Sequence, residues 1–333
     1  MDGLCCSPMN QFAAMTIQIL NEEQVRKLLP MAECIDVMAE AMKAASGGDV
    51  VQPIRTVLPV DDAGGHLFVM PAASRSLGCY GAKLISLTPA NAAKGLPAIR
   101  GSYLLFESET GAAVALIDAS SLTAIRTAAA SGLAARLLAR SDAATCGILG
   151  TGVQARTHVD AMKAVRPVRE VRIWGRDAGK AKRLAQELSS STGLRVTAHP
   201  DPSEVAACDL ICSVTGATQP ILKGDWVRPG AHVNLVGAHT LTQREADTEL
   251  VRRSLVFVDL LEAAKREAGD VMIPVQEGSV PADHIRGEIG KVAASALTGR
   301  TSPDQVTLYK SVGIAAQDLY AARHVFNKAR TIG

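Results

Sequence analysis

Aromatic side chains are scarce in this sequence, because Phe, Trp and Tyr make up only 3% of 333 residues. Proteins that bind single-stranded nucleic acids stack bases on aromatic rings, so the scarcity disfavours that class. An excess of one charge is also lacking: 35 Lys and Arg face 33 Asp and Glu, for a formal net charge of +2. Binding of nucleic acids needs clustered positive charge, so we expect no such partner. No apolar run reaches the roughly 18–20 residues of a membrane-spanning helix, so we expect no membrane association.

The seven cysteines show no pattern of a disulfide framework. Their odd number in a long chain is typical of a reduced, cytoplasmic protein. Cys208 and Cys212 have no second Cys or His pair near them, and the histidines are scattered, so we expect no metal site. Residues 1–14 lack the basic start of a signal peptide and are predicted to be a flexible extension.

The length suits two domains of about 150 residues. Residues 55–118 contain short β-like runs separated by Gly, Pro, Asn and Asp, which predict an antiparallel sheet. Residues 121–140 form a predicted Ala-rich helix. From about residue 143 to 299, apolar strands alternate with helices, which predicts a parallel sheet with right-handed crossovers. The last stretch predicts a strand leading into a long helix.

The strongest motif follows the apolar strand CGIL and opens a helix. It reads Gly150, Thr151, Gly152, Val153, Gln154, Ala155, the G-x-G-x-x-A pattern of dinucleotide binding. The first glycine makes the sharp turn, the second lets the pyrophosphate approach the backbone, and the alanine lets helix and strand pack closely. The free N–H groups of the helix N-terminus favour phosphates.

The tip of the next predicted strand decides between the two nicotinamide dinucleotides. An acidic residue there would bind the ribose 2′-hydroxyl of NAD. Here Arg176 occupies the tip and would attract the 2′-phosphate of NADP, so we expect NADPH, with NADH as the alternative. The other interpretation is that Arg176 is a solvated loop charge and that Asp177 binds the ribose.

Three basic residues lie among apolar neighbours in the first half of the chain: Arg55, Lys83 and Arg126. Strand alternation places Lys83 on the face opposite Ala82 and Leu84, where its side chain either extends to solvent or lines a pocket. Arg126 starts the Ala-rich helix, a natural position for an anion. Each of them, taken alone, is more often structural than functional.

Seven segments together resemble the ornithine cyclodeaminase/mu-crystallin family, from about residue 17 to 329. The resemblance implies a homodimer whose α/β subunit joins a Rossmann-type doubly wound parallel sheet, residues 143–305, to a discontinuous α+β domain for substrate binding and dimerisation, residues 15–142 and 306–333. The segments are MPA (70–72), GAKLIS (81–86), KGLPAIRG (94–101), LTAIRTAAASGLAARLLAR (122–140), GTGVQAR (150–156), EAGDVMIPV (267–275) and LYKSVG (308–313).

The resemblance also implies roles for single residues. Arg55 matches the arginine that binds the substrate carboxylate, and Lys83 matches the catalytic lysine. Arg126 and Thr127 match a pair at the pyrophosphate and the substrate carboxylate. The remaining expected cofactor contacts are Thr215, Val236, Lys310 and Ser311.

Two positions depart from the cyclodeaminases of the family. His239 stands where they carry an aspartate that acts on the substrate amine, and Phe68 stands where they carry a glutamate. The distal ammonium of ornithine needs a carboxylate partner, because burying an unpaired charge is costly. Ornithine is therefore expected to be a poor substrate.

We therefore expect NADPH-dependent reduction of a cyclic imino acid, 1-pyrroline-2-carboxylate or 1-piperideine-2-carboxylate, to L-proline or L-pipecolate. Arg55 and Arg126 would bind the carboxylate, and Lys83 would donate a proton or a hydrogen bond, with a pKa lowered by the two arginines. His239 either assists or is structural. The alternatives are an alanine or N-alkyl amino acid dehydrogenase, a cyclodeaminase that recycles its cofactor, and a crystallin-like NADPH-binding protein without turnover.

Overall fold

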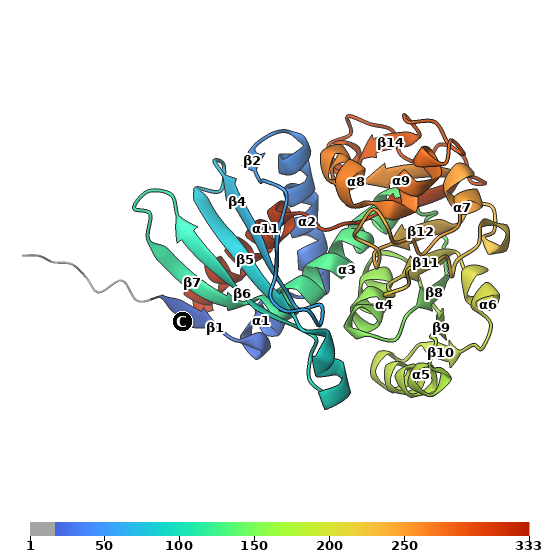
Figure 1. Ribbon diagram of the computed structural model, residues 1–333, viewed down its shortest axis with the longest axis horizontal. Coiled ribbons are helices and arrows are strands. Elements are labelled where there is room, and N and C mark those ends of the chain that lie inside the picture. The colour runs from blue at the N-terminus through green and yellow to red at the C-terminus, as the bar shows by residue number, and fades with distance from the viewer. Residues whose placement is uncertain (1–16, 333) are drawn as a thin grey trace, which may run out of the picture.

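The computed structural model describes residues 17–332, which fold around two sheets with helices between and outside them (Figure 1). The extension predicted for residues 1–14 lies outside the described residues. In the described part, no helix combines the length and the apolar character needed to span a membrane.

The first sheet has seven strands in the order β1-β7-β6-β5-β4-β2, and β3 pairs with β4. The pairs from β3 to β7 that lie side by side are antiparallel, as predicted, whereas β1 is parallel to β7. The strands are β1 (Gln18–Leu20), β2 (Val50–Val51), β3 (Thr56–Pro59), β4 (His66–Ser74), β5 (Cys79–Leu87), β6 (Ile99–Glu107) and β7 (Ala113–Asp118), and the short helix η1 (Pro89–Lys94) follows β5.

One face of this sheet is buried and the other is open. Along β5, Cys79, Lys83 and Ile85 are buried, whereas Leu84 is 41% exposed. The prediction that Lys83 and Leu84 lie on opposite faces is therefore confirmed. The buried face packs against α11 (Ala315–Ile332) and α3 (Ala119–Leu138), with α1 (Glu22–Leu28) and α2 (Met31–Ser46) beside them (Figure 1).

The second sheet is parallel and has eight strands in the order β10-β9-β8-β11-β12-β15-β13-β14. Helices alternate with its strands and give the doubly wound α/β arrangement that the sequence predicts (Figure 1). The strands are β8 (Thr145–Leu149), β9 (Glu170–Trp174), β10 (Arg195–Ala198), β11 (Leu210–Ser213), β12 (His232–Leu235), β13 (Ser254–Val258), β14 (Ile285–Glu288) and β15 (Val306–Lys310). The helices are α4 (Val153–Val165), α5 (Ala178–Thr192), α6 (Pro202–Ala206), η2 (Gly224–Trp226), α7 (Thr248–Arg252), α8 (Leu261–Glu267), α9 (Gly269–Gln276) and α10 (Ile289–Ala293).

Two sequence expectations about boundaries are wrong. The boundary expected between residues 305 and 306 does not match the sheet, because β15 pairs with β12 on one side and β13 on the other. Its apolar residues suit a strand that is buried on both faces. Arg126 does not start a helix: α3 begins at Ala119, capped by Asp118, and Arg126 lies two turns inside it.

Candidate active site

The site lies at the carboxyl ends of β8, β11 and β12. The chain progresses outward from β8 to β10 on one side and from β11 to β12 on the other, so the sheet order reverses between β8 and β11. Open α/β sheets bind ligands in the crevice at such a switch point. Gln154 after β8, Thr215 after β11 and Val236 after β12 all line one cavity there.

The loop from β8 to α4 has the features that a bound pyrophosphate requires. Gly150 has a φ of 130°, and a Cβ there would lie 2.8 Å from the carbonyl oxygen of Val214. No atom lies within 4 Å of a Cβ placed on Gly152, so the backbone is open to a ligand. No side chain caps α4, which leaves N–H groups of its first turn available, and Ala155 is fully buried against the sheet. These residues fit a dinucleotide.

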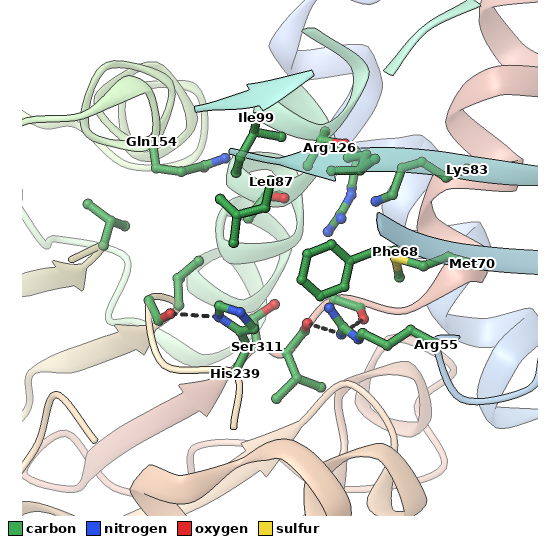
Figure 2. Close-up of a pocket in the computed structure, with 18 of the residues that line it drawn as sticks. Arg55, Phe68, Met70, Lys83, Leu87, Ile99, Arg126, Gln154, His239 and Ser311 are labelled. Carbon is green, nitrogen blue, oxygen red and sulfur yellow. Dashed lines mark hydrogen bonds between the residues drawn. The ribbon is translucent and has the colours of Figure 1, made fainter. Parts of the chain in front are cut away.

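The cavity has a volume of about 320 Å³ and joins the crevice to the buried face of the antiparallel sheet. Figure 2 shows Arg55, Lys83 and Arg126 at one end and the apolar Phe68 and Met70 between them. The predicted site residues that line it are Arg55, Lys83, Arg126, Thr127, Gln154, Thr215, Val236, His239 and Ser311.

Lys83 and Arg126 are tied together by one carboxylate. Asp318, in the first turns of α11, is 0% exposed and lies 2.7 Å from Lys83 Nζ and 2.8 Å from Arg126 Nε. Arg126 Nη1 also donates to Gln317 Oε1 at 2.6 Å. Within residues 17–332, Arg126 Nη2 donates to no acceptor, so it is available to a ligand in the cavity.

Arg55 connects the loop before β3 to the parallel-sheet half. Its Nε and Nη2 donate to the two carboxylate oxygens of Glu267 at 2.9 and 2.8 Å, and Nη2 also donates to the carbonyls of Val312 and Gly313. Only Nη1 has no acceptor among the described residues. Arg55 can therefore donate to a substrate carboxylate from one nitrogen and cannot bind it in a bidentate manner.

The electrostatics of the cluster set the protonation of Lys83. Burial and the neighbouring Arg126 lower the pKa of Lys83 to about 7, and Asp318 opposes this shift. Although burial favours the protonated acid, Arg126 and Lys83 together lower the pKa of Asp318. Lys83 and Arg126 share the single carboxylate of Asp318, so positive charge at this end of the cavity remains for an anionic ligand.

His239 follows β12 and lines the cavity, and its Nδ1 lies 3.1 Å from the carbonyl oxygen of Gly237 (Figure 2). A carbonyl only accepts hydrogen bonds, so Nδ1 carries the proton. Partial burial of the ring and the charge of Arg55 lower the pKa of His239, which is therefore neutral near pH 7. Its Nε2 is an acceptor in this state and has no proton to donate.

Lys310 was expected to contact the cofactor, and the structure places it elsewhere. Its side chain is fully buried, 3.0 Å from Asp270 Oδ2, and it donates to the carbonyl of Ala238 at 2.5 Å. Lys310 does not line the cavity. It instead fixes the loop that carries His239.

The remaining predicted cofactor residues lie around the crevice without all reaching the cavity. Thr215 donates its hydroxyl to Glu245, which also accepts from the backbone of Thr215 and Gly237 and thereby fastens the ends of β11 and β12. Val153 is 59% exposed at the start of α4. Arg176 is exposed at the tip of β9, where Asp177 accepts from the backbone N–H of Lys180 and caps α5.

Sequence reasoning missed Asp318, Glu267 and Glu245. Glu267 falls in the segment EAGDVMIPV, whose residues give no indication that its partner is Arg55. The available signal for Asp318 was a Gln-Asp pair inside the apolar start of a helix, since a carboxylate there needs a buried cation. The sequence does not identify that cation, because Lys83 and Arg126 are distant from Asp318 in the chain.

The profile of the ornithine cyclodeaminase/mu-crystallin family matches residues 15–332. The chain belongs to this family. It is 33% identical over 313 residues to the Delta(1)-pyrroline-2-carboxylate reductase of Bacillus cereus, covering 93% of this chain and 96% of that protein. It is 37% identical over 300 residues to the ketimine reductase mu-crystallin of Mus musculus, covering 90% and 91%.

A solved structure is also similar to this one. The Delta(1)-pyrroline-2-carboxylate reductase of Thermococcus litoralis, in complex with NADH and L-proline, superimposes with a TM-score of 0.92 at 35% identity, covering 95% of this chain and 98% of that one. The expected family and the expected α/β fold are thus confirmed.

The placement of Lys310 predicts a structural effect on mutation. Lys310→Met leaves the buried Asp270 without its cation, so the free energy of unfolding should fall by about 3–5 kcal/mol in urea denaturation. Lys182→Met, on the exposed side of α5, is the control and should change little. An unchanged unfolding midpoint together with weaker NADPH binding would restore Lys310 as a cofactor contact.

Proposed function

We propose that this protein is an NADPH-dependent reductase of cyclic imino acids that converts 1-pyrroline-2-carboxylate or 1-piperideine-2-carboxylate to L-proline or L-pipecolate. The observation that carries the proposal is the meeting of Lys83, Arg126 and Arg55 in one cavity that opens to the dinucleotide crevice. The names of the similar reductases support the same class of substrate.

The charges of the cavity suit a substrate with one carboxylate. Arg126 Nη2 and Arg55 Nη1 are the guanidinium nitrogens left for it, and hydrogen bonds between charged groups are the stronger kind. The apolar side chains of Phe68, Met70 and Ile85 form the wall beside them. A ring of CH₂ groups suits this wall, whereas the distal ammonium of ornithine would find no carboxylate among the residues that line the cavity.

Lys83 is the proton donor of the proposed reaction. Bound NADPH supplies the hydride that adds to the imine carbon. As the carbon–nitrogen double bond becomes a single bond, the nitrogen takes a proton from Lys83, which then regains one from solvent. With a pKa of about 7, Lys83 is partly protonated at neutral pH, which suits a general acid. His239 Nε2 can accept a hydrogen bond from the substrate or from water but supplies no proton.

The first test is NADPH oxidation with 1-pyrroline-2-carboxylate and 1-piperideine-2-carboxylate. We expect turnover with at least one of them, a fall in kcat as the pH rises above about 7, and a loss of about 10²–10⁴-fold in kcat for Lys83→Ala with NADPH binding retained. Absorbance at the nicotinamide band and fluorescence titration of NADPH measure the two quantities.

The control reactions separate the other activities of the family. Turnover only with pyruvate plus ammonia or methylamine would mean an amino acid dehydrogenase. Product from ornithine without net NADPH consumption would mean a cyclodeaminase, and NADPH binding without oxidation would mean a crystallin-like role. Each of these results would overturn the proposal.

The preference for NADPH rests on the tip of β9. Asp177 directs its carboxylate to the backbone of α5, and the neighbouring Arg176, Lys180 and Arg183 are exposed. This cationic group suits a 2′-phosphate better than a ribose hydroxyl. We therefore propose Arg176 as the residue that distinguishes NADPH from NADH.

Arg176→Ala should raise the KM for NADPH by about 10–100-fold, the effect of one hydrogen bond between charged groups, and leave the KM for NADH unchanged. Steady-state kinetics with both cofactors measure this, with Lys182→Ala as the control for general loss of charge. Equal effects on the two cofactors would remove Arg176 from this role.

We also propose a homodimer formed through the open face of the antiparallel sheet, which assigns dimerisation to the part of the chain before the parallel sheet. Ile19 pairs with Leu116, Leu116 with Leu104, and Leu104 with Ala82, so one apolar row crosses four strands. Ile19 is 70% and Leu116 36% exposed, and an apolar face of this extent is typical of an interface.

Leu116→Glu would place a charge in the middle of that row. We expect a dimer for the wild type and a shift to monomer for the variant in sedimentation velocity, with Lys182→Glu remaining dimeric. A monomeric wild type, or a variant that dimerises as well as the wild type, would contradict the proposed interface.

A cytoplasmic location is proposed on the state of the cysteines. Cys34, Cys79, Cys146, Cys208 and Cys212 are free thiols, and all five are buried. Free thiols suit a reducing compartment.

A further inference from the structure

Asp318 lies behind the cavity rather than in it. Its carboxylate is fully buried on a helix whose other early residues are mostly apolar. Burying a carboxylate costs several kcal/mol unless cations and hydrogen bonds compensate. Both compensating cations, Lys83 and Arg126, line the cavity, whereas Asp318 does not. Any effect of Asp318 on a substrate must therefore pass through these two side chains.

The geometry gives each carboxylate oxygen a separate partner. Oδ2 lies 2.7 Å from Lys83 Nζ, and Oδ1 accepts from Arg126 Nε at 2.8 Å. Lys83 comes from the middle of a strand and Arg126 from the interior of a helix, and Asp318 joins the charged ends of the two side chains. The neutral side chain of Gln317 accepts a further hydrogen bond from Arg126 Nη1 at its Oε1.

We propose that Asp318 is the positioning residue of the reductase: its carboxylate bridges Lys83 and Arg126 and fixes the Lys83 side chain beside Arg126, so that the proton donor and the carboxylate anchor meet the same substrate. This inference rests on the proposed function. Asp318 does not line the cavity, and it acts by holding the two residues that do.

The charges around Lys83 support this role. Burial, Arg126 and Arg55 all disfavour its charged form, and Asp318 is the group that favours it. Without that carboxylate, the pKa of Lys83 would fall below about 7, and its ammonium would be lost at neutral pH. A neutral amine at Lys83 is a poor proton donor.

The other titratable groups turned toward the cluster do not take over its charge. Burial raises the pKa of Tyr103 on β6, of Cys79 on β5 to about 11, and of Cys34 on α2, so all three are neutral at pH 7. Arg323 of α11 acts on Cys79, and Glu267 is engaged by Arg55. Asp259 accepts from the hydroxyl of Tyr309 and from the backbone of the β15–α11 turn, and burial raises the pKa of Tyr309. His239 is neutral near pH 7. Asp318 therefore remains the carboxylate that pairs with Lys83.

The decisive variant is Asp318→Asn, which keeps the shape and removes the charge. We expect kcat for imine reduction to fall about 10–100-fold at pH 8 and the descending limb of the pH profile to move by at least about one unit toward acid. NADPH binding, measured by fluorescence titration, should stay within about twofold of the wild type. Gln317→Leu is the matched control, because it removes a neutral partner of Arg126: we expect a change in KM with the pH limb in place.

Asp318→Glu tests the role without removing the charge. The descending limb of the pH profile of Asp318→Glu should stay at the wild-type pH. Its kcat should fall, because the longer side chain displaces Lys83 Nζ. This variant keeps the test decisive if Asp318→Asn does not fold, since a wild-type kcat in Asp318→Glu would refute positioning. If the wild type is active and the descending limb of the pH profile lies at the same pH in Asp318→Asn, the role of Asp318 is refuted and the proposed function is not. A wild type that reduces no cyclic imine would instead refute the proposed function.

Discussion

The burial of two cations, Lys83 and Arg126, against the single carboxylate of Asp318 is the constraint on which the site depends. Arg55 pairs with Glu267, whereas Lys83 and Arg126 share Asp318, so these two cations have one carboxylate partner between them. Buried charges are costly unless paired, and an incomplete pairing creates a strong preference for an anion that completes it. A substrate with one carboxylate supplies the missing negative charge. A substrate that also carries an ammonium would add back a positive charge.

The fold supplies these charges from distant parts of the chain because α3 packs against both sheets and α11 packs on the antiparallel sheet and on α3. α3 carries Arg126 from the end of the antiparallel sheet toward the dinucleotide crevice, and α11 returns from β15 to place Asp318 under Lys83. The cavity is therefore formed where the two halves meet. Asp259 fixes the turn between β15 and α11 by accepting from the backbone of Val312 and Gly313.

Local patterns in the sequence predicted the elements well. The glycine motif after β8, the β–α alternation and the buried face of Lys83 follow from periodicity and turn chemistry, which act over short stretches of chain. The partner of a buried charge is set by tertiary contacts, so Asp318 could not be matched to Lys83, and Lys310 was assigned to the cofactor when it pairs with Asp270. The expected domain boundary at residue 306 is wrong for a similar reason. The sequence of a single strand does not show which sheet the strand joins, and β15 joins the parallel sheet. The roles of Arg55, Lys83 and Arg126 came from family resemblance rather than from the residues alone.

The most direct measurement is a crystal structure of the protein with NADP⁺ and L-proline bound. We expect the proline carboxylate within hydrogen-bond distance of Arg126 Nη2 and Arg55 Nη1, the ring nitrogen beside Lys83 Nζ, and the α-carbon facing the nicotinamide ring. Asp318 should still bridge Lys83 and Arg126. A proline bound with its carboxylate away from both arginines, or with Lys83 turned away from the ring nitrogen, would contradict the proposed roles of these three residues.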